Sequence, residues 1–191
     1  MNHTNSTALT GKYISLQPLT DSHFEAIWQI ISSAPELYQY TTLGQTKEDL
    51  NKWFAQAKID GAFVVMDNAT QTLIGSTRLY NLNANVGHAN LGYTWYAPEC
   101  VGTNVNPEAK LLLLQHAFET LKLIRVGFEI DSDNMRSRKA VLKLGAQQEG
   151  ILRKHRKRIH DGVVSDTCVF SIIQSEWDEV KINLQQRIQS S

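Results

Sequence analysis

The loop at residues 101–106 is the segment of this sequence best suited to hold an anion, because a helix is predicted directly after it. Gly102 tolerates any φ angle, and Asn104 enters the left-handed region more readily than most residues. Asn106 is a favoured N-cap residue, and Pro107 suits the first helical position. Backbone N–H groups at such a helix start can converge on a phosphate or pyrophosphate. The simpler alternative is an ordinary, well-capped turn between a strand and a helix.

A second candidate site begins at Asn134, which is expected to end a strand and to cap the next helix. Ser137 lies one turn into that helix, where its hydroxyl could donate a proton. It could equally be a small residue that lets the helix pack closely. The neighbouring Arg136, Arg138 and Lys139 make the helix start basic. They suit an anionic group, although exposed basic residues often only solvate a surface.

Alternating strands and helices are predicted to position these residues. Strands are predicted at residues 13–19, 62–67, 72–80, 88–97, 124–130, 150–159 and 163–173. Helices are predicted at residues 20–34, 46–58, 107–121, 135–144 and 174–189. This order predicts one α/β (α+β) domain over residues 1–191, with helices on both faces of one sheet. Residues 1–11 are expected to form a flexible N-terminal segment.

Composition and charge exclude several classes of protein. Lys and Arg together number 19, equal to Asp plus Glu, so no global positive charge attracts nucleic acid or an anionic membrane. Only Cys100 and Cys168 are present, and the six histidines form no metal-like cluster. No apolar run approaches the ~20 residues that cross a bilayer, and the first residues lack the apolar core of a signal peptide. We expect a cytoplasmic protein that binds no metal, membrane or nucleic acid.

A run of basic residues at 153–158, "RKHRKR", stands apart from this neutral background. Along a strand these side chains would decorate a solvent-exposed face, where they also discourage aggregation between strand edges. They could instead recruit an acidic substrate, such as an acidic peptide or a phosphorylated metabolite. Contact with RNA is a third reading.

The order of the parts resembles the GNAT superfamily of acetyl-CoA-dependent N-acetyltransferases. The resemblance is closest to the branch of ribosomal-protein N-terminal acetyltransferases. It extends from about Tyr13 to about Trp177, with the motifs concentrated in residues 92–150. They are "LGYTWYAPE", "GTNVNPEAKLLLLQHAFE" and "NMRSRKAVLKLGAQQEG", followed by "HDG", "DTCVFSII" and "SEW". The resemblance implies a mixed sheet of about seven strands, splayed at the cofactor cleft.

The resemblance also implies roles for individual residues. The pantetheine arm of acetyl-CoA would pair with the strand edge at Thr94, Trp95 and Tyr96. The pyrophosphate would rest on the loop residues Gly102, Thr103, Asn104, Val105 and Asn106. Asn134 would hold the pantetheine arm, and Arg138 or Lys139 would reach the adenosine phosphate. Ser137 would lie near the thioester sulfur, and we expect it to act as the general acid.

Five positions depart from the pattern of the superfamily, three of them in the loop. The loop usually reads Gln/Arg-x-x-Gly-x-Gly/Ala, whereas this chain has Val101, Asn104 and Asn106 at the patterned positions. Asn90 replaces a Glu that many relatives carry, and Val141 replaces a Tyr.

A general base cannot be identified from the sequence. His88, Glu129 and His155 are candidates only because their side chains can titrate. An α-amino group, with a pKa near ~8, needs less help from a base than lysine, with a pKa near ~10.4. The missing base therefore favours an α-amine or another weakly basic acceptor.

We expect the chain to transfer an acetyl group from acetyl-CoA to a primary amine, either a protein N-terminus or a small-molecule amine. The amine would attack directly while both substrates are bound. The alternative is a CoA-binding module of the same fold without catalysis, suggested by the missing Glu and Tyr. Tyr38, Tyr40 and Trp53 could wall an acceptor pocket or simply pack. The C-terminal helix, through Trp177, Val180 and Leu184, could supply a homodimer contact.

Overall fold

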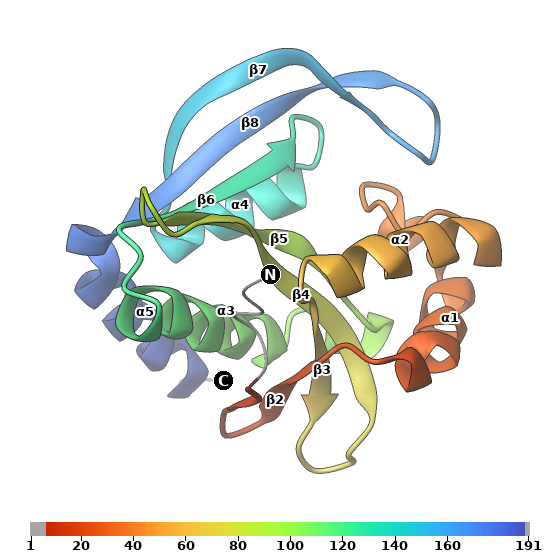
Figure 1. Cartoon of the computed structure of the whole chain (residues 1–191), viewed down its shortest axis with the longest axis horizontal. Helices are drawn as coiled ribbons and strands as arrows, with labels where there is room; N and C mark the ends of the chain where they lie inside the picture. Colours follow the sequence, from red (N-terminus) through yellow and green to blue (C-terminus); the bar gives the residue numbers. More distant parts are fainter. Residues whose placement is uncertain (1–6, 190–191) are drawn as a thin grey trace.

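The computed structural model describes residues 7–189, whose strands form one mixed eight-stranded sheet in the order β1-β2-β3-β4-β5-β6-β8-β7 (Figure 1). The strands are β1 Leu9–Thr10, β2 Ile14–Pro18, β3 Phe63–Asp67, β4 Leu73–Asn83, β5 His88–Tyr96, β6 Arg125–Asp131, β7 Gln147–Lys157 and β8 Val164–Ile173. The sheet has one strand more than expected, because Leu9 and Thr10 pair with β2. Residues 1–6 of the N-terminal segment expected to be flexible lie outside the described residues.

Five α-helices accompany the sheet, together with short helical turns. The α-helices are α1 Phe24–Ser33, α2 Lys47–Ile59, α3 Val105–Gln115, α4 Met135–Leu144 and α5 Trp177–Gln189. The 3₁₀ turns are η1 Asp21–His23, η2 Pro35–Tyr38, η3 Pro98–Cys100 and η5 Gln174–Glu176, and a π-helical turn, η4 His116–Thr120, extends α3.

The sheet separates two hydrophobic clusters, which confirms that helices lie on both faces. Buried residues of α1 and α2 pack on one face, with Trp95 of β5 contributing its ring. Residues of α3, α4 and α5 pack on the other face, where Phe118 and Trp177 stack with ring centroids 5.4 Å apart. Trp177, Val180 and Leu184 are buried in this cluster. The expectation that these three residues supply a homodimer contact is therefore wrong, because their side chains are buried in the core of this chain.

The sheet opens between β5 and β6, as the resemblance implies. These two strands are parallel and pair only at their first three positions, ending at Asn90 opposite Gly127. Beyond this point β6 stays paired with β8 on its other side, and β5 stays paired with β4. The inner edges of both strands therefore face an opening instead of each other.

A β-bulge shapes β5 at this opening. Ser76 of β4 lies opposite Trp95, whereas Arg78 lies opposite Gly92, so Tyr93 and Thr94 share one partner position. Tyr93 adopts a φ of +52°, which is costly for a non-glycine residue. Packing holds it there, because the Arg78 guanidinium lies 3.9 Å from the centroid of the Tyr93 ring. Bulges of this kind re-aim backbone groups next to active sites.

Helix α3 is anchored to the start of β2 by a buried carboxylate. Glu108 is only 4% exposed. Its carboxylate oxygens accept hydrogen bonds from the backbone N–H groups of Lys12, Tyr13 and Ile14, with N···O distances of 2.7, 2.8 and 2.9 Å. This contact holds α3 in place against the start of β2.

Helix α4 ends at Gly145, which has a φ of +106° and donates its N–H to the carbonyl of Leu142. A Cβ at this position would meet Val180 Cγ2 at 3.1 Å. Gly145→Ala is expected to lower the free energy of unfolding by about 1–2 kcal/mol, since a side chain in this region of φ is strained. Urea denaturation measures the change. Gly150→Ala is the matched control, because a Cβ at Gly150 meets nothing within 4 Å, and a loss there as large as at Gly145 would contradict the expectation.

Candidate functional site

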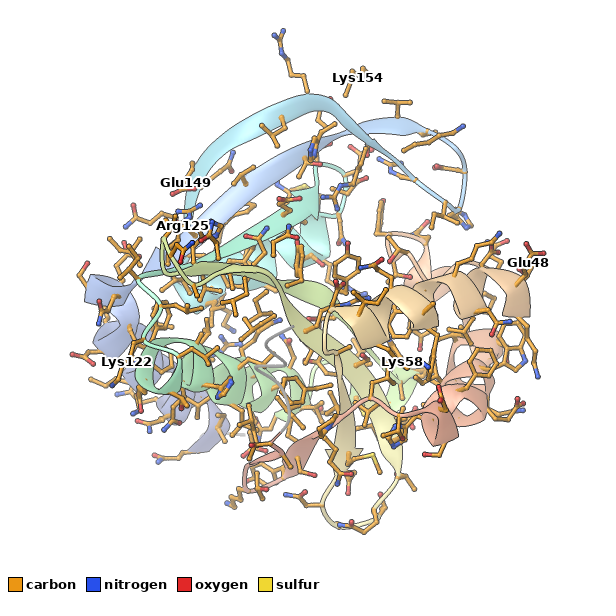
Figure 2. The ribbon with its side chains drawn as sticks, in the orientation of Figure 1. Glu48, Lys58, Lys122, Arg125, Glu149 and Lys154 are labelled. Carbon is orange, nitrogen blue, oxygen red and sulfur yellow. The ribbon has the colours of Figure 1, made fainter. Side chains whose placement is uncertain are left out.

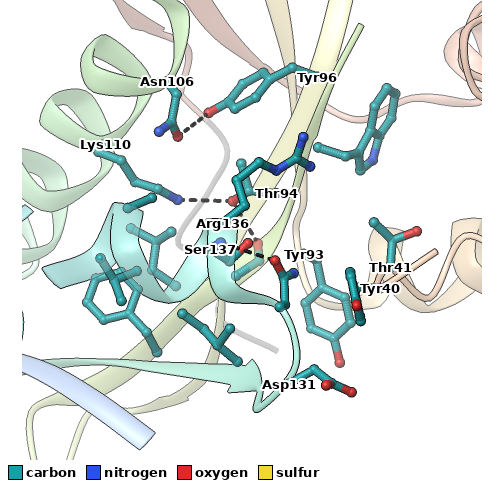
Figure 3. A pocket seen from close by; sticks show the side chains of 18 of the residues that line it. Tyr40, Thr41, Tyr93, Thr94, Tyr96, Asn106, Lys110, Asp131, Arg136 and Ser137 are labelled. Atoms are coloured by element: carbon teal, nitrogen blue, oxygen red, sulfur yellow. Dashed lines mark hydrogen bonds between the residues drawn. The ribbon is translucent and has the colours of Figure 1, made fainter. Parts of the chain in front are cut away.

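A cavity of about 360 Å³ lies at the opening between β5 and β6. Its walls come from β5, β6, the start of α3 and the first turns of α4, and Figure 3 shows these elements converging. The cavity therefore lies where the loop at residues 101–106 meets the start of the helix that follows Asn134.

The structure brings most of the predicted site residues together around this cavity. The predicted residues that line the cavity are Thr94, Trp95, Tyr96, Gly102, Asn106, Asn134 and Ser137. Thr103, Asn104, Val105 and Arg138 do not line it. The guanidinium Nη1 of Arg138 donates to the carbonyl of Ser132 at 3.0 Å, so this side chain folds back on the segment that leads into α4. Arg136, two residues earlier, faces the cavity instead.

The predicted start of the long helix is wrong by two residues. Helix α3 begins at Val105 with Asn104 as its N-cap residue, so Asn106 and Pro107 lie inside the first turn. The Asn104 amide does not cap the helix but donates to the carbonyl of Ile188 in α5 at 3.3 Å. Thr103 shapes the turn, because its Oγ1 donates to the carbonyl of Cys100 at 2.8 Å. Pro107 is tolerated because the first four N–H groups of a helix lack intrahelical partners.

Gly102 is the residue of the loop whose conformation requires glycine. Its φ is +84°, and a Cβ built on it would meet nothing within 4 Å. Asn104, by contrast, has a φ of −70° and is not strained. The loop thus presents an open backbone at Gly102 beside the start of α3, which suits the close approach of an anion.

Helix α4 begins as the sequence predicts. Asn134 caps it, since its Oδ1 accepts a hydrogen bond from the N–H of Ser137 at 3.1 Å. This bond fixes the position of Ser137 on the cavity wall and leaves the Asn134 side-chain NH₂ as the donor group of that residue.

Two side-chain hydrogen bonds span the cavity from α3 to β5 (Figure 3). The Tyr96 hydroxyl donates to Asn106 Oδ1 at 3.2 Å, and burial raises the pKa of Tyr96. Lys110 Nζ donates to Thr94 Oγ1 at 3.0 Å, and burial lowers the pKa of Lys110 to about 7. Sequence reasoning missed Lys110, although a lysine that follows Ala109 and precedes four leucines was a visible signal.

Two carboxylates line the β6 side of the cavity. Glu129 accepts hydrogen bonds from Asn90 Nδ2 at 3.3 Å and from Arg156 at 2.7 Å. Burial acts to raise the pKa of Asp131, but hydrogen bonds from Arg158 and Ser165 outweigh it and lower the pKa. Of the three candidate bases only Glu129 lines the cavity, whereas His88 and His155 do not.

The basic run 153–158 is not simply a solvated face. Arg158 bonds to Asp131, Asp133 and Asp161, and its side chain is only 12% exposed. Lys154 points away from the sheet (Figure 2). Arg156 and Arg158 of this run are thus paired with carboxylates of this chain, which weakens the alternatives of RNA contact and of an acidic substrate.

A second wall of the cavity comes from the segment after η2 and from α2. It consists of Tyr40 and Thr41 of that segment and Trp53 of α2, together with Tyr93 of β5. The Tyr38 hydroxyl donates to the carbonyl of Tyr96 at 3.0 Å, so this segment is tied to β5. Tyr40, Thr41 and Tyr93 lie across the cavity from Asn106 and Lys110 of α3 (Figure 3).

The described residues fit acetyl-CoA. A pantetheine arm needs backbone donors and acceptors in a row, and the edge of β5 beyond Asn90 has no strand partner on its β6 side. A pyrophosphate needs convergent N–H groups, and a helix start such as that of α3, beside the open backbone at Gly102, is the kind of backbone that can offer them.

The described part of the chain holds neither a cluster of metal-ligating side chains nor a membrane-spanning helix. Between residues 7 and 189 no group of three or more His, Cys, Asp or Glu side chains is placed to hold a metal ion. Within the same residues no helix is long and apolar enough to cross a membrane.

Comparison with known proteins places this geometry in a family. Residues 14–147 match the family model described as "Acetyltransferase (GNAT) domain". The chain is 27% identical over 168 residues to the uncharacterised N-acetyltransferase YoaA of Bacillus subtilis, a match that spans 83% of this chain and 92% of YoaA. It is 32% identical over 111 residues to YdaF of the same organism, provisionally named a ribosomal N-acetyltransferase, spanning 58% of each chain.

Solved structures agree with the sequence matches. The crystal structure of a GCN5-related N-acetyltransferase from Brucella melitensis superposes with a TM-score of 0.85 at 26% identity, covering 94% of this chain and 84% of the other. Since the family model spans residues 14–147, more than half of the sequence, and the splayed sheet and its cavity agree with it, this chain belongs to the GNAT family and is an acetyl-CoA-dependent acetyltransferase.

Proposed function

We propose that this acetyltransferase transfers its acetyl group to a primary amine, by direct attack while both substrates are bound. Acetyl-CoA supplies the acetyl thioester. The observation that carries the proposal is the unpaired edge of β5, which shares one cavity with the α3 start, Ser137 and Glu129.

Each group of residues around the cavity has its own role in this proposal. Thr94, Trp95 and Tyr96 offer their backbone edge to the pantetheine arm, and the Asn134 NH₂ group donates to it. The backbone of residues 102–106 holds the pyrophosphate. Arg138 reaches the adenosine phosphate from outside the cavity, which requires its guanidinium to leave the carbonyl of Ser132.

We further propose that Ser137 donates a proton to the leaving sulfur. Its N–H is held by Asn134, which keeps the hydroxyl at the cavity wall. Ser137→Ala is expected to lower kcat about 10²-fold, within the range of general acid catalysis, and to leave the Kd for acetyl-CoA unchanged. Steady-state kinetics and calorimetry measure the two effects. Ser132→Ala, in the same segment but outside the cavity, is the matched control, and an unchanged kcat in Ser137→Ala would remove the role.

Glu129 is the residue that we propose as the base. Many relatives carry a carboxylate where this chain has Asn90, and here Glu129 of the neighbouring strand places its carboxylate against the Asn90 amide. The carboxylate therefore stands at the point where β5 and β6 separate, and it can accept the proton released by the attacking amine.

The acceptor that we propose is an α-amino group, as at the N-terminus of a protein. Such an amine has a pKa near ~8 and is partly neutral at physiological pH, whereas a free lysine is almost fully charged. The aromatic wall at Tyr40, Trp53 and Tyr93 suits the apolar part of a peptide. The likeness to YdaF supports a ribosomal-protein N-terminus as the first acceptor to try.

The decisive experiment incubates the purified protein with acetyl-CoA and a panel of amines, including ribosomal-protein N-terminal peptides, and measures thiol release. Acetylation of an α-amine supports the proposal. Binding of acetyl-CoA by calorimetry without thiol release for any amine would favour the alternative, a CoA-binding module without catalysis. Asn90 and Val141, which replace a Glu and a Tyr of many relatives, are the observation behind that alternative.

Two further proposals concern the setting of the protein. The free, buried Cys100 and Cys168 suit a reducing compartment, and we propose the cytoplasm.

A homodimer would have to use a surface other than the buried side of α5, for example the side that carries Ile182, which is 54% exposed. Light scattering measures the mass.

A further inference from the structure

A primary amine of this chain stands inside the proposed acetyl-transfer site. Asn106 and Lys110 are four residues apart in α3, so they lie on one side of that helix. Both reach across the cavity to β5, Asn106 to Tyr96 and Lys110 to Thr94 (Figure 3). Since the loop before α3 is the proposed pyrophosphate site, Lys110 lies one helical turn further along the proposed path of the pantetheine arm.

The surroundings of Lys110 do not neutralise its charge with a carboxylate. Its Nζ atom donates to a neutral hydroxyl, Thr94 Oγ1, which in turn lies 2.8 Å from Thr77 Oγ1. Among the described residues no carboxylate lies within salt-bridge distance of it. The charged groups that line the same cavity are Glu129, Asp131, Arg136, Arg156 and Arg187. The two acids pair with Arg156 and Arg158 instead of with Lys110.

These surroundings favour the neutral amine. Burial lowers the pKa of Lys110 to about 7, so near neutral pH an appreciable share of the molecules carries an uncharged Nζ with a free lone pair. An exposed lysine with a pKa near ~10.4 is uncharged in fewer than about one molecule in 10³ at pH 7. A desolvated lysine of this kind is an activated nucleophile.

We propose that Lys110 is itself an acetyl acceptor, so that the protein acetylates this residue from bound acetyl-CoA. The inference rests on the proposed function, because it uses the same donor and the same cavity. It differs in the acceptor, which is a side chain of the enzyme instead of a second substrate.

The step balances without another reactant. The lone pair of Lys110 Nζ forms a bond to the carbonyl carbon of the thioester, and the bond between that carbon and sulfur breaks. The amine loses one proton, and the leaving thiolate takes one up, so the products are N-acetyl-Lys110 and CoA. The amide keeps one N–H, which can still donate to Thr94 Oγ1. The added acetyl group occupies the cavity, so the modified protein is expected to bind acetyl-CoA more weakly.

The experiment incubates the full-length protein with acetyl-CoA at pH 7 and follows acetylation of each lysine by peptide mass spectrometry. Lys110 is expected to be acetylated about 10-fold or more faster than the exposed Lys143 of α4, because burial lowers the pKa of Lys110 to about 7 and its Nζ lies in the cavity proposed to hold the thioester. Lys110→Met, which keeps an unbranched side chain, removes the signal, and Lys143→Met leaves it intact. Protein acetylated at Lys110 is expected to show at least a 10-fold higher Kd for acetyl-CoA.

Two measurements separate the failure of this inference from the failure of the proposed function. Calorimetry reports acetyl-CoA binding, and trace labelling with acetic anhydride reports the reactivity of each lysine without the cofactor site. Normal binding together with Lys110 acetylation no faster than that of Lys143 overturns the inference and leaves the proposed function standing. Absence of binding overturns both, whatever the labelling pattern. If Lys110→Met fails to fold, the comparison of Lys110 with Lys143 in the unmodified sequence still decides.

Discussion

Glu129→Gln is expected to lower kcat/KM for acetyl transfer about 10²- to 10⁴-fold, the range typical of general base catalysis. The reason is that Glu129 is the carboxylate at the point where β5 and β6 separate, within 3.3 Å of the Asn90 amide. A glutamine keeps the shape and one acceptor oxygen but cannot take the proton of the attacking amine. The Kd for acetyl-CoA is expected to stay unchanged, because the loop before α3 and the β5 edge are untouched.

The control for Glu129 is Glu149→Gln. Glu149 also forms an ion pair with an arginine, Arg125, at 2.5 Å (Figure 2), but it lies in β7 and does not line the cavity. The Glu149→Gln variant should keep kcat/KM within about twofold of the unmodified protein. The loss of a surface ion pair changes the stability of the fold little. A Glu129→Gln protein with full activity toward α-amines would show that Glu129 is not the base.

Glu108→Ala is expected to lower the free energy of unfolding by about 3–5 kcal/mol. The carboxylate accepts three backbone hydrogen bonds, from Lys12, Tyr13 and Ile14. A hydrogen bond to a charged group contributes about 1.5–3 kcal/mol, and buried donors left without a partner add a desolvation penalty. In a chain of this length the loss corresponds to a fall in Tm of about 2–4 °C for each kcal/mol. Chemical denaturation and calorimetry measure the two quantities.

The control for Glu108 is Glu48→Ala. Glu48 (Figure 2) also lies in the first turn of a helix, α2, but its side chain is 79% exposed, and within residues 7–189 its ion pair is with Lys52. Its removal should cost about 0.5 kcal/mol or less. Equal losses for the two variants would mean that Glu108 acts only through the helix dipole, as its position in the sequence suggests.

A loss of α3 anchoring also has a functional consequence. The start of α3 and Lys110 are carried by the helix that Glu108 ties to β2. The Glu108→Ala protein is therefore expected to bind acetyl-CoA more weakly even where it remains folded.

Contacts between close neighbours in the chain could be predicted from the sequence. The cap of α4 by Asn134 joins atoms three residues apart, and the end of that helix at Gly145 follows from the glycine. The splayed mixed sheet and the family followed from the order of motifs between residues 92 and 150. The start of α3 was predicted two residues late, because the turn is made by Thr103 and Cys100, and Asn104 is drawn to Ile188 of α5.

The sequence by itself thus determined the family, the order of elements and part of the cavity lining, such as Thr94, Asn134 and Ser137, since periodicity, caps and turns depend on residues close together in the chain. Only the tertiary structure decided that Glu108 holds β2, that Glu129 stands beside Asn90, and that Lys110 reaches Thr94. These pairs lie 16 to 96 residues apart, and no local pattern encodes them. Burial between packed layers sets both the partners of such polar groups and the pKa of an amine such as Lys110.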